Sequence, residues 1–348
     1  MKADQMHPAL LFEKLADDRV QCNLCAHRCL IKEGGVGVCR VRENREGELF
    51  TRVYGQTAAR HLDPIEKKPL FHFYPGTQAY SIAAPGCNFR CSWCQNASIS
   101  QLAPGQGLPG REYLSPKEVL AAARGSGARS IAYTYTEPTI FFEYCYDIAR
   151  LAKPAGLKNV FVSNGYMTGE MLDLMHPFLD AVNVDLKGFR EKLYRRYAGA
   201  SLAPVLDNLR RMKELEIWVE VTTLIIPGLN DSQGELEDAA HFIASELGPG
   251  TPWHISRFAP AYRMQDRPAT PVSKLLQAQK IGRETGLRYV YLGNVPGQSN
   301  THCHHCGQLL ISRHGYRIDT SQIVEENRCP SCGTPAAGRG LGPGVPDS

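Results

Sequence analysis

Apolar runs rich in β-branched and aromatic residues alternate with amphipathic stretches from residue 79 to residue 293. The apolar runs predict strands at 79–84, 130–136, 158–163, 181–186, 217–226, 252–258 and 288–293. The amphipathic stretches predict helices near 115–125, 139–153, 168–176, 202–215, 232–247 and 272–285. One helix start is marked by Ser115, Pro116 and Glu118, which have the spacing of a capping box with proline at the first helical position.

This alternation of strands and helices predicts a parallel sheet joined by right-handed crossovers. Six or seven strand–helix units are fewer than the eight of a closed barrel. We therefore expect an α/β fold whose core is an incomplete, (β/α)6-type parallel barrel. Because chemistry in such barrels sits at the carboxyl ends of the strands, the residues that follow each strand are the candidate site.

The chain divides into four parts. We expect a Cys-rich N-terminal module with a connecting loop at 1–78, the barrel at 79–299, a zinc-ribbon-like module at 300–334 and a disordered tail at 335–348. The tail is dominated by Pro, Gly and Ala, a composition that cannot bury a core. A short helix is predicted at 10–18. The segment 63–76, with three prolines and three aromatic residues, is either a linker or a binding loop.

Charge and hydropathy narrow the functional class only slightly. The 348 residues carry a formal net charge of +4, which is too small to indicate binding to nucleic acid or to a membrane surface. No apolar run approaches the roughly 20 residues that span a bilayer. Charged residues interrupt positions 1–18, so they form no signal-peptide core. We expect a cytoplasmic protein with no membrane partner.

The twelve cysteines carry the strongest chemical signal. All but one fall into three closely spaced sets, and such spacing favours metal binding over disulfides in a chain without a secretion signal. The sets are Cys22, Cys25, Cys29 and Cys39; Cys87, Cys91 and Cys94; and Cys303, Cys306, Cys329 and Cys332. Cys145 stands alone in a helix-like run, and we interpret it as a small buried apolar residue.

The first and third sets each offer four thiolates. Two CxxC pairs with strand-like runs between them predict a zinc ribbon near the C-terminus. In the N-terminal set, glycines at 34, 35 and 37 let the backbone turn back toward Cys39. Structural zinc is preferred there over a second iron–sulfur cluster, because the spacing does not match the ferredoxin run. The sequence leaves open both alternatives for the N-terminal set, zinc and an iron–sulfur cluster.

The middle set is incomplete. Cys87, Cys91 and Cys94 follow a predicted strand, whereas a structural zinc ion or a cysteine-held four-iron cube takes four protein ligands. Three thiolates therefore leave one position open for a substrate or a cofactor. The alternatives are a zinc site completed by a distant residue, or reduced cysteines in the core.

CxxxC followed by x-aromatic-Cys, with Trp93 as the aromatic residue, resembles the cluster motif of the radical SAM enzymes. Over nearly the whole chain the sequence is similar to the radical SAM member of the AmmeMemoRadiSam system, and more broadly to pyruvate formate-lyase activating enzymes. The stretches that carry this resemblance include 63–70, 94–96, 253–255 and 293–295. The resemblance implies a 4Fe–4S cluster on Cys87, Cys91 and Cys94, with S-adenosylmethionine (SAM) on its open iron.

The resemblance also implies which residues at the strand ends contact SAM. Glu137 matches a segment that grips the amino group, Lys187 matches a lysine near the carboxylate, and Ile226 matches an isoleucine against the adenine. The implied cofactor-binding set is Trp93, Thr136, Glu137, Ser163, Asn164, Asp185, Lys187 and Ile226. By residue type alone, several of these are equally well explained as a helix cap, a turn or strand-end charges.

The implied function is reductive cleavage of SAM to a 5′-deoxyadenosyl radical, which abstracts a hydrogen atom from an unidentified substrate. No catalytic residue beyond the cluster ligands is implied, and the implied partner is a reductase or a flavodoxin- or ferredoxin-type electron donor. Two extra cysteine modules favour a large substrate, a protein or an RNA, with segment 63–76 and the ribbon as candidate lids. The competing hypothesis is a non-enzymatic, zinc-dependent nucleic-acid-binding or scaffold protein.

Overall fold

An eight-stranded sheet forms the centre of the protein, in the order β16-β15-β14-β13-β12-β11-β9-β8. The computed structural model describes residues 6–342 apart from 106, 110 and 111. The strands are β8 (Ala59–Pro64), β9 (Gln78–Ala83), β11 (Ser130–Tyr133), β12 (Lys158–Ser163), β13 (Ala181–Asp185), β14 (Trp218–Ile225), β15 (Trp253–Arg257) and β16 (Val290–Gly293). All neighbours pair in parallel except β8, which runs antiparallel to β9. Over the described residues β8 and β16 do not pair, so the sheet is not closed.

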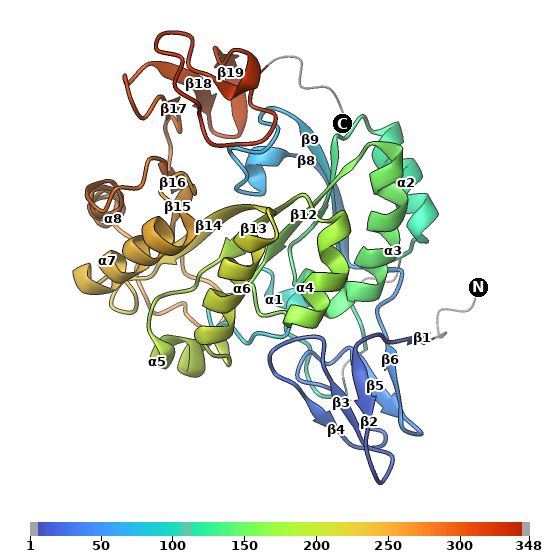
Figure 1. The fold of residues 1–348 in the computed structure, drawn as a ribbon. Helices are drawn as coiled ribbons and strands as arrows, with labels where there is room; N and C mark the ends of the chain where they lie inside the picture. Colours follow the sequence, from blue (N-terminus) through green and yellow to red (C-terminus); the bar gives the residue numbers. More distant parts are fainter. Residues whose placement is uncertain (1–5, 106, 110–111, 343–348) are drawn as a thin grey trace.

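Helices link the parallel strands and cover the outer face of the sheet (Figure 1). The main ones are α2 (Pro116–Gly125), α3 (Phe142–Ala152), α4 (Gly169–Met175), α6 (Ala203–Glu214), α7 (Gln233–Phe242) and α8 (Val272–Glu284). Shorter pieces are α1 (Ala97–Ser100), α5 (Glu191–Leu193), η2 (Pro138–Phe141), η3 (Lys153–Ala155), η4 (His176–Phe178), η5 (Tyr194–Ala198) and η6 (Ile243–Leu247). Each crossover leads to the next strand in the sheet, which places all the main helices on one face. The predicted parallel α/β core is confirmed, and β8 is an addition to it.

The local sequence explains both faces of the sheet. β11 is buried at every position, as expected of a parallel strand covered on both sides. Toward the helices it places Tyr133, whose ring packs 5.4 Å from that of Phe161. The predicted capping box also forms: Ser115 accepts from the Glu118 amide, and Glu118 accepts from the Ser115 amide.

The segment after β8 crosses the inner face of the sheet near the start of its strands. It contains η1 (Ile65–Lys67). Its Ile65, Leu70 and Phe73 pack against small residues of the sheet that include Ala79 and Ala181. Asn183 on β13 also donates to the Pro69 carbonyl, at 2.8 Å. The segment therefore forms a floor on the inner side of the sheet, and the expectation that it acts as a lid is corrected.

The N-terminal module is built from short strands. One sheet contains β1 (His7–Pro8), β5 (Arg42–Arg45) and β6 (Glu48–Thr51), another contains β2 (Phe12–Lys14), β3 (Val20–Cys22) and β4 (Leu30–Ile31), and β7 (Gln56–Thr57) pairs with β10 (Glu112–Tyr113). The helix predicted at 10–18 is wrong, because Asp17 and Asp18 adopt positive φ in the turn between β2 and β3. β8 belongs to the main sheet, so part of the connecting loop expected within 1–78 is a strand of that sheet.

A buried ion pair joins the N-terminal module to the core. Arg42 on β5 lies 2.8 Å from Glu143 on α3, and both side chains are almost completely excluded from solvent. The same Glu143 oxygen accepts from the Leu10 amide. Because removing one partner would leave the other charge buried and unpaired, this pair fixes how the module docks on α3.

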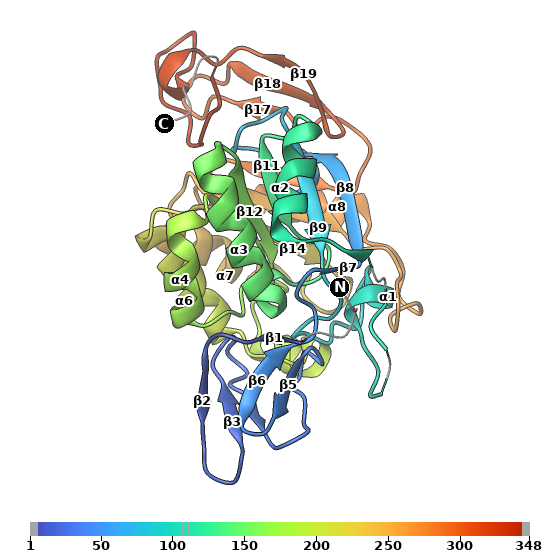
Figure 2. The same ribbon diagram turned by 90° about the vertical axis from the view of Figure 1, so that its right-hand side faces the viewer.

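A C-terminal module lies at the opposite end of the molecule from the N-terminal one (Figures 1 and 2). It contains β17 (Thr301–His302), β18 (Leu309–His314), β19 (Arg317–Ser321) and the short turn η7 (Glu325–Asn327). Its own small core includes Leu310, Ile311, Ile323 and two of its cysteines.

The chain then returns to the sheet, so the predicted disorder of 335–348 is wrong for 335–342. Ala336 and Leu341 are buried, and the backbones of Arg339 and Phe73 form a parallel bridge. Glycine makes this approach possible, because a Cβ at Gly340 would overlap the ring of Tyr74. Residues 343–348 lie outside the described part of the chain.

None of the helices formed by the described residues has the length and apolar character needed to cross a bilayer.

A buried polar network joins the floor segment, the sheet and the C-terminal residues. Glu220 on β14 accepts from the amides of Phe71 and His72 and lies 2.6 Å from His254 on β15. The His72 ring contacts the Ala337 carbonyl and the Tyr291 hydroxyl, each at 2.6 Å. Since a carbonyl only accepts, Nδ1 of His72 carries the proton, and neutral His72 satisfies both partners.

Burial lowers the pKa of His72 from 6.5 to about 4, although Glu220 opposes the shift. Between these values the unfolded chain binds a proton that the folded chain does not, so the free energy of unfolding falls as pH drops from about 6.5 to about 4. Each pKa unit is worth about 1.4 kcal/mol, which gives a loss of up to about 3 kcal/mol.

We expect His72→Gln to remove the part of the free energy of unfolding that depends on protonation of His72. The unfolding midpoint of the variant should therefore depend less on pH than that of the wild type between about pH 6.5 and about pH 4. Thermal unfolding at several pH values measures the slope, with His241→Gln on the exposed face of α7 as the matched control. Equal slopes in the wild type and His72→Gln would contradict the assignment.

Candidate functional site

A cavity of about 550 Å³ lies between the floor segment and the carboxyl ends of the strands. Its wall includes Cys87, Cys91 and Cys94 together with the ends of β11, β12, β13 and β14. Of the residues predicted to contact a cofactor, it contains Trp93, Thr136, Glu137, Ser163, Asn164, Asp185 and Lys187. The structure therefore brings together in one cavity residues that the sequence places on four separate segments.

The cysteine loop follows β9 and is held in place by its backbone. The amides of Arg90 and Ser92 donate to the carbonyls of Ala198 and Tyr197, at 2.7 and 3.0 Å. Two polar groups also contact the sulfurs: the Phe89 amide donates to Cys87 at 3.4 Å, and the Ser100 hydroxyl lies 3.1 Å from the Cys94 sulfur. These contacts hold the three thiols on one side of the cavity.

The three thiols suit a soft metal centre that is open on one side. Burial raises the pKa of Cys91 to about 12 and also raises the pKa of Cys87 well above its usual range. Both of these thiols are therefore protonated unless a cation is present, and a bound cation would deprotonate them. The three sulfurs do not all lie within 4.8 Å of one another, a wider spacing than that of the C-terminal cysteines described below. Soft thiolate donors at this spacing fit an iron–sulfur cluster.

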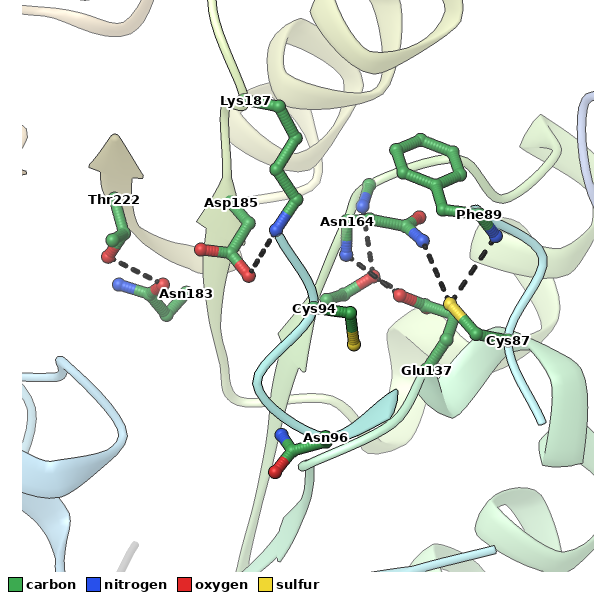
Figure 3. A network of polar contacts seen from close by, with 12 residues as sticks. Cys87, Phe89, Cys94, Asn96, Glu137, Asn164, Asn183, Asp185, Lys187 and Thr222 are labelled. Carbon is green, nitrogen blue, oxygen red and sulfur yellow. Dashed lines mark hydrogen bonds and ion pairs between the residues drawn. The ribbon is translucent and has the colours of Figure 1, made fainter. Parts of the chain in front are cut away.

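Glu137 is held in place by four hydrogen bonds. Its Oε1 accepts from the backbone amide and hydroxyl of Thr139 and from the hydroxyl of Ser163, and its Oε2 accepts from the backbone amide of Asn164, all at 2.7–3.0 Å. The carboxylate is buried and caps η2. Glu137 therefore joins the ends of β11 and β12, as the close-up in Figure 3 shows for Asn164, and its contact with an amino group stays a prediction.

Asn164 extends this connection to the cysteine loop. Its side-chain nitrogen Nδ2 donates to Oδ1 of Asn88 at 2.7 Å and lies 3.9 Å from the Cys87 sulfur. Its side-chain oxygen Oδ1 accepts from the backbone amide of Tyr166. The amide nitrogen of Asn88 is buried without a partner among the described residues. Asn164 therefore sets the position of Cys87 relative to the strand ends.

An ion pair lies at the end of β13. Lys187 is 2.8 Å from Asp185, and both side chains face the cavity (Figure 3). Burial alone would lower the pKa of Lys187, but Asp185 and the nearby Cys91 outweigh it, so the pKa is raised and the lysine is a permanent cation. A fixed cation beside three thiols is suited to an anionic group of a bound molecule.

The remaining predicted residues differ in whether they line the cavity. Trp93 is mostly buried beside Tyr197, and the Thr136 hydroxyl donates to the Ala84 carbonyl at 2.7 Å. Ile226 is fully buried and does not line the cavity, and its contact with an adenine stays a prediction. Leu224, two residues earlier on β14, lines the cavity instead.

Lys68 is a cavity residue that sequence reasoning missed. Its ammonium lies 2.6 Å from Asp63 and 4.5 Å from the ring centre of Tyr135, whose hydroxyl also donates to Asp63. Burial lowers the pKa of Lys68 to about 8, although Asp63 opposes the shift. Tyr135 has a positive φ of 63°, and Asn96 of the cysteine loop donates to its carbonyl. In the sequence, Lys68 is marked only by its place in the charged, proline-rich segment 63–76, which is interpreted there as a linker or a binding loop.

The C-terminal cysteines form a compact set. Their four sulfurs lie within 4.8 Å of one another, and both Cys303–Cys332 and Cys306–Cys329 are 3.6 Å apart. Four thiolates around one tetrahedral ion with metal–sulfur bonds of about 2.3 Å would lie about 3.8 Å apart. This is the arrangement of a closed metal-binding site.

The three cysteine sets and the cavity can be compared with known proteins. A family model described as the Radical SAM superfamily matches residues 81–243. These residues form a radical SAM domain. The matched range holds the three cavity cysteines and the strand ends around them, and the chain is an enzyme of this type.

The chain is similar to two sequence relatives and to one solved structure. The uncharacterized protein MJ0808 of Methanocaldococcus jannaschii is 45% identical over 331 residues, which are 94% of this chain and 98% of that protein. The pyruvate formate-lyase-activating enzyme of Clostridium pasteurianum is 23% identical over 57% of this chain and 87% of its own length. The structure of Streptococcus suis SuiB bound to S-adenosylmethionine has a TM-score of 0.50 at 11% identity, over 66% of this chain and 53% of SuiB, and so supports the fold alone.

The superfamily implies a 4Fe–4S cluster and SAM. The three cavity cysteines are the residues that would hold the cluster, and their donor chemistry and spacing fit it. The hypothesis of a non-enzymatic zinc-dependent protein is not supported by these relatives.

We expect Glu137→Gln to lower the free energy of unfolding by about 1–3 kcal/mol, because an amide nitrogen in place of Oε2 leaves the buried Asn164 amide without an acceptor. Chemical denaturation under anaerobic conditions measures this loss. The control is Glu284→Gln at the exposed end of α8, which we expect to change stability by less than about 0.5 kcal/mol. Equal stabilities of the two variants would refute the positioning role of Glu137.

Proposed function

We propose that this enzyme holds a 4Fe–4S cluster on Cys87, Cys91 and Cys94 and cleaves SAM there, and that the radical formed removes a hydrogen atom from a protein. With one electron from the cluster, the sulfonium of SAM would yield methionine and a 5′-deoxyadenosyl radical. The observation that carries this proposal is the cavity in which three thiols with no fourth cysteine share a wall with the polar ends of β11, β12 and β13.

The residues around the cavity divide the binding task. Lys187, kept charged by Asp185, supplies a cation for the carboxylate of SAM. Ser163 and Asn164 face the cavity beside it, held by Glu137. Leu224 offers the apolar contact at the end of β14 that we had expected from Ile226.

The substrate would approach from the unclosed side of the sheet. A second cavity of about 360 Å³ lies beside the first, and the two share Pro69, Ser256, Asn294 and Tyr316. Tyr316 belongs to the turn between β18 and β19 of the C-terminal module. A module at this position suits recognition of a large partner, and the relatives named as activating enzymes favour a protein over an RNA.

Several finer assignments complete the proposal. The chain would be the radical SAM component of the AmmeMemoRadiSam system, on the motifs given above, and would take its electron from a reductase or a flavodoxin- or ferredoxin-type carrier. Cys303, Cys306, Cys329 and Cys332 would hold one zinc ion in a ribbon-like module, supported by their tetrahedral sulfur spacing. None of the twelve cysteines, all of them in the described part of the chain, forms a disulfide, which suits a reducing cytoplasm.

We expect anaerobically purified, chemically reduced protein to convert SAM to 5′-deoxyadenosine, and we expect Cys87→Ala to lose this activity because the cluster loses a ligand. Chromatographic detection of the nucleoside measures it. Cys145→Ala, which changes a buried cysteine outside all three sets, is the matched control, and Cys303→Ala is expected to keep the activity. Wild-type-level cleavage by Cys87→Ala would sink the proposal.

The substrate class is tested by following the abstracted atom. Reduced enzyme and SAM are incubated with extract from cells grown in heavy water, and mass spectrometry measures deuterium in the 5′-deoxyadenosine. We expect transfer from the macromolecular fraction, abolished by protease and unaffected by ribonuclease. Loss on ribonuclease treatment would indicate an RNA, and transfer from the small-molecule filtrate alone would contradict a macromolecular substrate.

A further inference from the structure

The two four-cysteine sets of this chain differ in geometry. The C-terminal sulfurs all lie within 4.8 Å of one another, whereas in the N-terminal set no three of the sulfurs do, although all four residues are described. A single tetrahedral ion needs sulfurs about 3.8 Å apart. The N-terminal set, Cys22, Cys25, Cys29 and Cys39, is therefore too wide for one zinc ion.

The four N-terminal thiols nevertheless gather around one place. The Cys22 amide donates to the Cys29 carbonyl at 2.9 Å, so these two residues lie on neighbouring backbone segments. Gly37 lies between Cys29 and Cys39, because a Cβ placed on it would be 3.7 Å from both sulfurs. Cysteines that are neighbours without close contact between their sulfurs suit a body larger than one ion.

The backbone is arranged to support thiolates at this place. The Val38 amide donates to the Cys29 sulfur at 3.5 Å. The buried guanidinium of Arg42 adds a positive charge beside the set. Amide–sulfur hydrogen bonds of this kind stabilise cysteine-held clusters and tune their potentials.

The set also lies directly against the cysteine loop of the main cavity. A Cβ on Gly86, the residue before Cys87, would be 3.1 Å from the Cys39 carbonyl oxygen. Arg90 donates to the carbonyls of both Cys87 and Val38, and the His27 ring contacts the Asn88 carbonyl at 2.8 Å. The two sets are thus separated by little more than one layer of backbone.

We propose that Cys22, Cys25, Cys29 and Cys39 bind a second iron–sulfur cluster, adjacent to the one at Cys87, Cys91 and Cys94. This goes beyond the proposed function and rests on it only for the identity of the neighbouring cluster. It also reverses the preference for zinc that the sequence suggested, because motif spacing does not report the distances between the sulfurs.

Metal and sulfide analysis of anaerobically prepared protein tests the proposal. A four-iron cluster at each of the two sets predicts about eight irons, eight acid-labile sulfides and one zinc per chain. A two-iron cluster at the N-terminal set predicts about six irons, six sulfides and one zinc. About four irons and four sulfides with two zinc ions would overturn it. This measurement uses the wild-type protein, so it does not depend on the folding of any variant.

The combined variant Cys87→Ala, Cys91→Ala and Cys94→Ala isolates the N-terminal set. We expect it to keep two or four irons with equal sulfide and, after reduction, an electron paramagnetic resonance signal that SAM does not alter. Cys145→Ala should leave every count unchanged. Zinc without sulfide at the N-terminal set would refute the second cluster. The outcome is independent of SAM cleavage, so failure of the proposed function would be seen separately.

Discussion

The carboxylate of Glu137 is the interaction on which the geometry of the cavity depends. It is buried, and burying a charge is costly unless hydrogen bonds replace water. Four donors do so here, from the start of η2 and from the end of β12. Through Asn164 and Asn88 the same network reaches the cysteine loop. The thiols are thus positioned relative to the strand ends by a side chain whose own oxygens are already occupied.

Much of the core could be predicted because its physics is local. A strand buried on both faces must be apolar, and an amphipathic helix must repeat its apolar face, so both are visible in short windows of sequence. The parts that were missed depend on distant contacts. β8 is a strand because it pairs with β9, and 335–342 is ordered because small residues let it approach Tyr74.

The sequence predicted where the site lies more successfully than what each of its residues does. A polar residue after a parallel strand must lie near the cavity, but its type does not tell whether its oxygens face a ligand or a neighbouring strand. Glu137 turned out to face its neighbours, and Ile226 to point into the core. Lys68 was missed because its environment is made by Tyr135, far away along the chain.

The returning C-terminal segment gives the metal-binding module a thermodynamic consequence for the cavity. Residues 335–342 pack in the small core of the module and also pair with the backbone at His72 to Tyr74, within the segment that forms the cavity floor. Folding of the module and ordering of the floor are therefore linked equilibria. A metal that binds only the folded module also raises the stability of the floor. Although the two sites are far apart in sequence, occupancy of one adds to the rigidity of the other.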